Sequence, residues 1–246
     1  MRYQALAVDY DGTIATDGKV DEATRAALRC VKASGRRLVL VTGRELADVT
    51  AAFGDLALFD LAVVENGSVL HEPASRATAV LGEPPSPAFV TELARRGVAH
   101  LAVGQVIVAT RASFAPTVLG VIRDRGLSLQ VVFNREALMV LPAGVHKGSG
   151  LGAALSRLKV APPHTVAIGD AENDHAMLAL CGYGAAVANA LPALKARAQF
   201  VTRGECGRGV AELVERLIAF DLPEPARETS RLDTPRPDDR PPVESR

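Results

Sequence analysis

Short runs of apolar residues alternate with helical segments along most of this chain. One run covers residues 5–8, and others follow at 38–41, 61–64 and 166–168. These runs are apolar at every position rather than at every second one, which is typical of strands buried on both faces of a sheet. The alternation therefore predicts an α/β fold in which helices cover both faces of a parallel sheet.

Residues 73–142 interrupt this alternation. Helical segments near 87–96 and 114–125 are each followed by two extended runs, which makes an αββ unit repeated twice. We expect a small α+β domain here, inserted as a cap between two parts of a Rossmann-like core at 1–72 and 143–222.

The last residues, 223–246, differ in composition from the rest of the chain. They hold six of the fifteen prolines and many charged residues, with few apolar ones. Such a segment buries too little apolar surface to offset the entropy lost on ordering. We expect a disordered tail or a linker, and a linker would imply a further C-terminal domain.

Two carboxylates follow the first predicted strand directly, in the sequence Asp9-Tyr10-Asp11-Gly12-Thr13. Ligands of α/β proteins bind at the carboxyl ends of parallel strands, and the spacing lets both side chains face one small site. A solvated acidic turn is the alternative interpretation of such a short motif.

A second acidic motif, Gly169-Asp170-Ala171-Glu172-Asn173-Asp174, follows a later strand. Carboxylates that gather at one sheet edge repel each other unless a hard cation such as Mg²⁺ binds between them. We therefore expect Asp170 to meet Asp9 and Asp11 at a metal site. For Asp174, capping of the following helix remains a serious alternative.

Two further segments have the residue types of a phosphate site. Thr42-Gly43-Arg44 follows the second strand, where a hydroxyl and backbone N–H groups can hold phosphate oxygens. Lys147 opens a helix just after the interrupting segment.

These four motifs, in this order on these elements, resemble the haloacid dehalogenase superfamily of phosphohydrolases. The resemblance extends to about residue 222, and the inserted segment resembles the αββ cap of its Cof-like subgroup. Glu65-Asn66-Gly67 also matches a turn common in that subgroup.

The resemblance implies a mechanism. Asp9 is expected to attack phosphorus and form an aspartyl-phosphate, while Asp11 protonates the leaving oxygen and later activates water. Mg²⁺ is expected on the Asp9 and Asp170 carboxylates and the Asp11 carbonyl, with Asp174 orienting them.

The resemblance also implies which residues hold the phosphate. Thr42 and Lys147 are expected to bind the transferring phosphoryl oxygens. The remaining candidates for substrate binding are Gly43, Arg44, Asn66 and Asn173. Gln105, Arg111, Asn134 and Arg135 of the cap are candidates for choosing the substrate, although solubility explains them equally well.

We therefore expect a Mg²⁺-dependent phosphatase for a small phosphomonoester, such as a sugar phosphate or a phosphoglycolate-like acid. A phosphomutase of the same family is an alternative, as is a phosphate-ligand sensor that serves a further C-terminal domain. A receiver domain is disfavoured because its acceptor Asp belongs after a later strand.

Charge and cysteine content narrow the possible partners. The 28 basic and 28 acidic residues balance, so no electrostatic surface for nucleic acid or an anionic membrane is expected. No apolar stretch approaches the length of a membrane helix. The three scattered cysteines indicate reduced thiols and a cytoplasmic protein.

Overall fold

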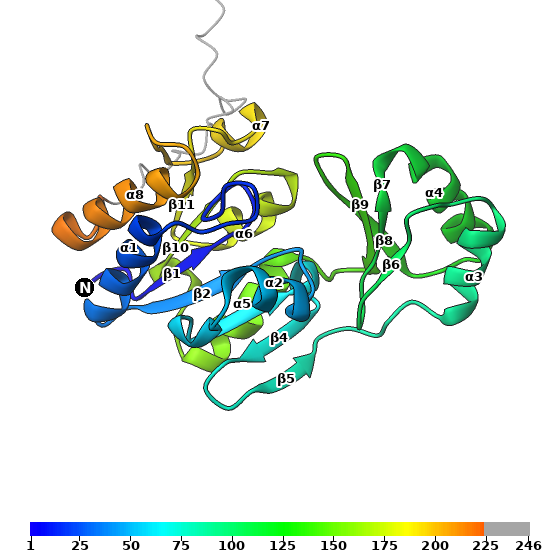
Figure 1. Cartoon of the computed structure of the whole chain (residues 1–246), viewed down its shortest axis with the longest axis horizontal. Helices are drawn as coiled ribbons and strands as arrows, with labels where there is room; N and C mark the ends of the chain where they lie inside the picture. Colours follow the sequence, from blue (N-terminus) through cyan, green and yellow to red (C-terminus); the bar gives the residue numbers. More distant parts are fainter. Residues whose placement is uncertain (224–246) are drawn as a thin grey trace, which may run out of the picture.

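The computed structural model describes residues 1–223, whose strands form two separate sheets (Figure 1). The larger sheet has eight strands in the order β12-β11-β10-β1-β2-β3-β4-β5. Its strands are β1 (Ala5–Val8), β2 (Arg37–Val41), β3 (Leu61–Val64), β4 (Val69–Glu72), β5 (Ala77–Val80), β10 (Thr165–Gly169), β11 (Tyr183–Ala186) and β12 (Phe200–Val201).

Strand β1 lies near the middle of this sheet, parallel to β10 on one side and to β2 on the other. Ala5 is in register with Thr165 and with Arg37, and all four residues of β1 are buried. The carboxyl ends of β1, β2 and β10 therefore meet at one edge of the sheet, which is where the acidic motifs and Thr42 begin. The predicted α/β fold with a parallel core sheet is confirmed.

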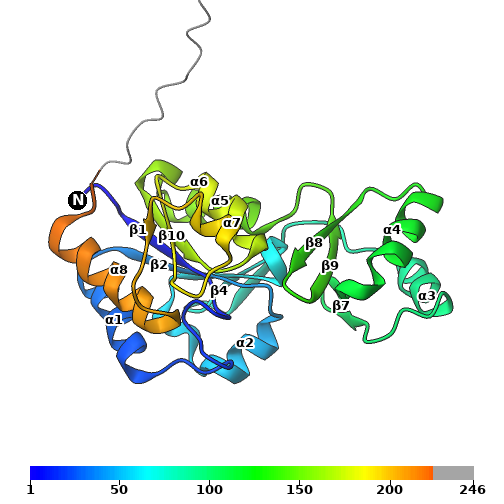
Figure 2. The ribbon, with the colours of Figure 1, turned by 90° about the horizontal axis from the view of Figure 1, so that it is seen from above.

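Helices cover both faces of the large sheet (Figure 2). On one face lie α1 (Glu22–Ala33), α2 (Leu46–Phe53) and α8 (Cys206–Phe220), and on the other lie α5 (Lys147–Leu158) and α6 (His175–Leu180), with the short α7 (Pro192–Lys195) near β11. Asp21 caps the start of α1, because its carboxylate accepts a hydrogen bond from the N–H of Thr24 at 2.7 Å.

The smaller sheet is antiparallel, with four strands in the order β6-β7-β9-β8. Its elements are α3 (Pro87–Arg95), β6 (Ala102–Val103), β7 (Val108–Arg111), α4 (Ala115–Asp124), β8 (Leu129–Asn134) and β9 (Ala137–Pro142). Phe89 and Leu93 of α3 pack with Val118 and Val121 of α4 against Val140, so the two helices cover one face. The other face carries a separate apolar group that includes Met139.

The expected boundary at residue 73 is wrong. Strand β5 pairs with β4 and extends the large sheet, so residues 77–80 lie with the core rather than with the inserted segment. All four β5 residues are exposed, and an exposed edge strand lacks the apolar run by which buried strands are identified. The second sheet begins only with β6.

Two other expectations concern the C-terminal tail and the absence of a membrane-spanning helix. The tail was expected at 223–246, and all of it except Pro223 lies outside the described residues. Within residues 1–223 no helix is both long and apolar enough to cross a membrane.

Candidate active site

The chain turns sharply after β1 and brings Asp9 to the sheet edge. The carbonyl of Tyr10 accepts hydrogen bonds from the N–H groups of Thr13, Ile14 and Ala15. Gly12 has φ +75°, and a Cβ at this position would lie 2.5 Å from Oδ2 of Asp170. Only glycine fits here, because the turn needs a left-handed conformation and because the Asp170 carboxylate lies against it.

Three carboxylates meet at this edge, those of Asp9, Asp170 and Asp174. One oxygen atom of each lies within 4.8 Å of the others, and all three residues are buried. The hydroxyl of Thr13 lies 3.1 Å from Oδ2 of Asp9 and 3.4 Å from Oδ1 of Asp170. Carboxylate oxygens are the ligands that hard divalent cations prefer, so these three residues are able to hold a metal ion.

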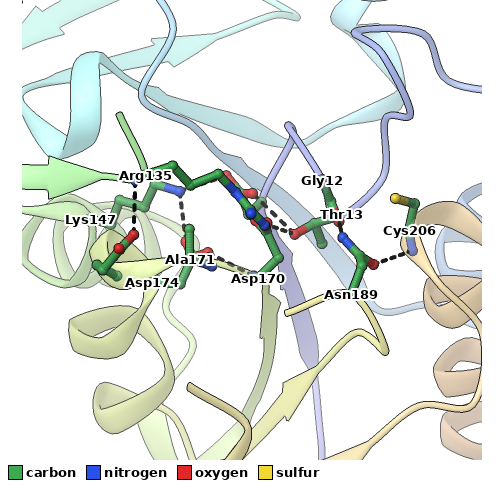
Figure 3. A network of polar contacts seen from close by, with 11 residues as sticks. Gly12, Thr13, Arg135, Lys147, Asp170, Ala171, Asp174, Asn189 and Cys206 are labelled. Atoms are coloured by element: carbon green, nitrogen blue, oxygen red, sulfur yellow. Dashed lines mark hydrogen bonds and ion pairs between the residues drawn. The ribbon is translucent and has the colours of Figure 1, made fainter. Parts of the chain in front are cut away.

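Lys147 connects two of these carboxylates. It is the first residue of α5, and its ammonium lies 2.6 Å from Oδ1 of Asp9. The ammonium also lies 2.6 Å from Oδ1 of Asp174, and Figure 3 draws Lys147 beside Asp174. Burial alone would lower the pKa of Lys147, but the carboxylates of Asp174 and Asp9 outweigh burial and raise it. The ammonium therefore stays charged in a buried position.

The cluster nonetheless carries more negative charge than Lys147 offsets. Burial raises the pKa of Asp9 well above its ordinary value, the Asp174 carboxylate raises it further, and Lys147 lowers it. Burial likewise raises the pKa of Asp170, against a hydrogen bond from Arg135 that lowers it. Excess buried negative charge on oxygen donors is the electrostatic condition that a divalent cation relieves.

Asp174 does not cap the helix that follows it. The acidic motif continues as a single 3-10 turn at Glu172–Asp174, and α6 begins at His175 with no side-chain cap from Asp174. Its Oδ2 instead accepts hydrogen bonds from the N–H groups of Asp170 and Ala171, at 2.9 and 3.0 Å. Asp174 thus orients both the backbone at Asp170 and the ammonium of Lys147.

Asp11 is not part of the cluster of three carboxylates and pairs with Arg44 instead. Its two oxygens accept hydrogen bonds from Nε and Nη2 of Arg44, at 2.7 and 2.6 Å. Arg44 in turn lies beside Thr42, whose hydroxyl accepts a hydrogen bond from the Arg44 N–H at 3.1 Å. Three of the predicted site residues therefore form a second group next to the first.

Asn66 and Asn173 form a third group. The amide of Asn173 donates to the side-chain oxygen of Asn66 at 3.0 Å, and Asn66 donates its backbone N–H to the carbonyl of Thr42. Nδ2 of Asn66 and Oδ1 of Asn173 are buried without a partner. Two buried amide atoms without a partner are suited to a polar ligand, and the Asn173 side chain lies near Gly43.

The turn that contains Asn66 is pressed against the start of α5. Gly67 has φ +107°, and a Cβ there would lie 2.1 Å from the carbonyl oxygen of His146. This close approach sets where α5 begins, and so where Lys147 enters the site.

A cavity of about 240 Å³ lies between the carboxylates and the smaller sheet. The core side of its lining is polar and includes Asp9, Asp11, Gly43 and Arg44. The other side comes from β6, β7 and β9 with neighbouring loops: Ala102, Ile107, Ala109, Asn134, Ala137 and Met139.

A comparison of the whole sequence with protein families identifies the family of this chain. The family of haloacid dehalogenase-like hydrolases matches residues 6–82 and 128–214. The chain belongs to the haloacid dehalogenase-like hydrolases. The sequence resemblance to this superfamily is thereby confirmed, together with the expectation of an enzyme.

One relative and two solved structures are informative for this haloacid dehalogenase-like hydrolase. A phosphoglycolate phosphatase of Methanothermobacter thermautotrophicus is 34% identical over 88% of this chain and all of its own length. A HAD subclass IIB sugar phosphatase has the same fold, with a TM-score of 0.72 at 18% identity over 87% of this chain and 98% of its own. So does a putative COF-like hydrolase of Plasmodium vivax, with a TM-score of 0.74 at 20% identity over 90% of this chain and 97% of its own.

The family and the phosphatase relatives support the expectation of a phosphoric monoester hydrolase. The fold of the solved structures is consistent with the Cof-like arrangement of core and inserted cap.

Sequence reasoning missed the role of Glu65 in this hydrolase. Its buried carboxylate accepts hydrogen bonds from the N–H groups of Gln105, Val106 and Ile107, at 2.9, 2.8 and 3.0 Å. These bonds fasten the loop between β6 and β7 to the core. Glu65 was noted only as part of a turn, and nothing local in the sequence indicates where its side chain points.

Asn189 was also missed. Its amide donates to the carbonyl of Gly12 at 2.8 Å, and its oxygen accepts from the N–H of Cys206 at 2.8 Å (Figure 3). It therefore joins the turn after β1 to the start of α8. An asparagine far from both motifs carries no signal for this contact.

Proposed function

We propose that this hydrolase is a Mg²⁺-dependent phosphatase that acts on a small phosphomonoester through an aspartyl-phosphate on Asp9. The observation that carries the proposal is the buried pair of Asp9 and Lys147 next to Asp170, with Asp9 in the lining of a small cavity. A carboxylate nucleophile, a fixed cation and a metal-binding carboxylate are the groups that phosphoryl transfer requires.

The carboxylates of Asp9 and Asp170 would hold Mg²⁺, together with the backbone carbonyl of Asp11. The fit rests on three buried carboxylates that lie close together, two of which share Lys147, and burial raises the pKa of Asp9 and of Asp170. Bound Mg²⁺ offsets the charges of carboxylate and phosphate, so that the two anions can approach each other.

Asp9 begins the reaction. An oxygen of its carboxylate forms a bond to phosphorus, the bond from phosphorus to the ester oxygen breaks, and that oxygen takes a proton from Asp11. Lys147 holds Asp9 in place and lies where charge develops on the phosphoryl oxygens. Because Arg44 now holds both oxygens of Asp11, the Asp11 side chain must turn toward the leaving oxygen when substrate binds.

Asp11 also acts in the second half of the reaction. It takes a proton from a water molecule whose oxygen attacks phosphorus of the aspartyl-phosphate. The bond between phosphorus and the Asp9 oxygen then breaks, which releases inorganic phosphate and restores the Asp9 carboxylate.

The remaining predicted residues would bind the phosphoryl group. The hydroxyl of Thr42 and the backbone of Gly43 lie at the carboxyl end of β2, where Asn66 bonds to the Thr42 carbonyl and the Asn173 side chain lies near Gly43. Hydroxyl and amide groups fixed before the reaction stabilise the charge on transferring oxygens.

The substrate would be small. The cavity of about 240 Å³ is closed on one side by the segment between β5 and α5, which we assign as the cap. A phosphoglycolate-like acid is favoured over a larger sugar phosphate by the phosphoglycolate phosphatase that shares 34% identity. No nucleic acid or membrane is needed as a partner, and a cytoplasmic location is part of this proposal.

Phosphate release from a panel of small phosphomonoesters tests the proposal. We expect release that requires Mg²⁺, stops with a chelator, and is lost in Asp9→Asn. Asp124→Asn on the outer face of the cap is the matched control and should keep wild-type activity.

Two outcomes would contradict the phosphatase proposal and indicate another function. Transfer of phosphate to a second position of the substrate, without free phosphate, would indicate a phosphomutase. A folded protein that binds phosphate compounds but neither releases nor transfers phosphate would indicate a sensor.

A further inference from the structure

Arg135 of the cap contacts the carboxylate cluster of the core through an ion pair with Asp170. It occupies the turn between β8 and β9 with φ +51°, and its backbone N–H donates to Oε2 of Glu172 at 3.0 Å. Its guanidinium donates to Oδ2 of Asp170 (Figure 3). Of the ion pairs found in residues 1–223, this is the one that joins the cap to the core acids.

The guanidinium of Arg135 and a metal ion compete for the same carboxylate of Asp170. Its side chain is 2% exposed, and Arg135 takes the oxygen that faces Gly12. Lys147 contacts Asp9 and Asp174, so Arg135 is the cation that neutralises Asp170 here. A divalent cation on the same carboxylate cancels the charge that holds Arg135, and two neighbouring cations repel.

Arg135 is free to move once its partner is neutralised. Its side chain is 49% exposed, and the neighbouring Asn134 lines the cavity. The backbone bond to Glu172 keeps the turn over the site while the side chain changes partner.

The cap side of the cavity lining carries no charged residue, and Arg135 itself lies next to this lining rather than in it. Its lining from this side consists of alanines, Ile107, Met139 and the amide of Asn134. Arg44 lines the core side, but it pairs with Asp11 and shares the lining with Glu45 and Asp48, so acidic neighbours still offset its charge when Asp11 turns. Arg135 is the cap cation that adjoins this lining, as the neighbour of Asn134, so we expect an anionic group on the leaving side of a substrate to reach it.

We propose that Arg135 determines specificity by binding a carboxylate on the leaving group of the phosphomonoester, and that its pair with Asp170 is its position in the absence of metal and substrate. A guanidinium presents paired N–H groups that match the two oxygens of a carboxylate. This inference rests on the proposed function and narrows its substrate class.

Two substrates of equal size test the inference. Phosphoglycolate carries a carboxylate where 2-hydroxyethyl phosphate carries a hydroxymethyl group. In Arg135→Gln we expect kcat/KM to fall by roughly 30- to 100-fold for phosphoglycolate, mostly through KM, because a charged hydrogen-bonded pair is lost. For 2-hydroxyethyl phosphate we expect a change of at most about 3-fold, since that substrate never made the pair.

Two variants control for charge and for general effects on the cap. Arg135→Lys keeps the charge without the fork and should recover part of the loss for phosphoglycolate. Arg123→Gln removes an exposed cap arginine on α4 and should change neither substrate.

Binding of Mg²⁺ gives a second readout that needs no turnover. In calorimetry without substrate, Arg135→Gln should bind Mg²⁺ several-fold more tightly than the wild type, because the competing cation is gone. Arg123→Gln should bind it as the wild type does.

The outcomes separate the inference from the proposed function. An equal loss for both substrates, or no loss for either, would overturn the role of Arg135 while phosphatase activity stands. A wild type that prefers 2-hydroxyethyl phosphate to phosphoglycolate would also overturn the role of Arg135. A wild type that hydrolyses no phosphomonoester at all would overturn the proposed function, and with it this inference.

Discussion

The ammonium of Lys147 lies 2.6 Å from Oδ1 of Asp9, and both side chains are almost completely buried. The two residues are 138 positions apart in the chain, and Asp9 precedes the inserted cap in the sequence while Lys147 follows it. Their contact ties the start of α5 to the end of β1, so the pair is part of the fold as well as of the site.

Replacing Lys147 tests this double role. Lys147→Met would leave Asp9 and Asp174 buried without a counter-charge, so we expect the free energy of unfolding to fall by about 3–5 kcal/mol. Urea denaturation in the presence of a chelator measures the change. Lys159→Met, which removes an exposed lysine just after the same helix, should change it by no more than about 0.5 kcal/mol. Equal stability of the two variants would contradict the prediction.

Alanine substitutions at Gly67 and Gly97 distinguish the cost of a steric clash from the cost of backbone strain. Both have positive φ, +107° and +81°, but a Cβ at Gly67 would meet the carbonyl of His146 at 2.1 Å, whereas nothing lies within 4 Å at Gly97. We expect Gly97→Ala to cost about 1–2 kcal/mol from strain alone. Gly67→Ala should cost at least about 3 kcal/mol and also lower kcat, because α5 and Lys147 must shift. Similar costs at both positions would show that α5 is not held by this contact.

Glu65 is expected to hold the cap in its position over the cavity. Glu65→Gln keeps the size of the side chain but replaces one acceptor oxygen by a donor, which cannot accept from the N–H groups at 105–107. We expect faster hydrogen exchange of those amides by roughly 10-fold, which corresponds to about 1.4 kcal/mol of lost protection.

Exchange elsewhere in the core should stay as it is in the wild type. Glu72→Gln, which removes the partly exposed partner of Arg157, is the matched control. If amides 105–107 exchange at the wild-type rate in Glu65→Gln, the carboxylate does not fasten the cap.

Asp60 gives the fold a defined pH dependence. Burial alone would raise the pKa of its carboxyl, but hydrogen bonds from Lys32, the Leu38 N–H and Arg37 outweigh burial and lower it below 3.8. The unfolded chain then binds the proton more readily than the folded one, so the stabilisation is present above the ordinary pKa and is lost as pH falls through the lowered value.

Asp60→Asn measures this contribution. Near neutral pH we expect the variant to be less stable by about 1–2 kcal/mol in urea denaturation. Below about pH 4 the difference should shrink, because the wild-type carboxyl is then being protonated too. A difference that is the same at all pH values would show that charge is not what Asp60 contributes.

Sequence patterning determined the core of this protein. Uniformly apolar runs predicted the buried parallel strands, and the acidic motifs directly after two of them predicted that Asp9 and Asp170 meet at one sheet edge. Such inferences work because burial on both faces leaves a local signature, and because parallel strands bring their carboxyl ends together. Strand β5 escaped prediction, since an exposed edge strand lacks that signature.

Tertiary structure alone decided which charged groups meet across the cap. Arg135 contacts Asp170 from 35 residues away, and Glu65 binds amides about 40 residues further along. The partners of these side chains depend on how the small sheet sits against the large one, which is set by packing around Met139 and its neighbours rather than by any local pattern. A charged side chain in a loop has the same sequence signal whether it faces solvent or another domain, so only the folded chain distinguishes the two.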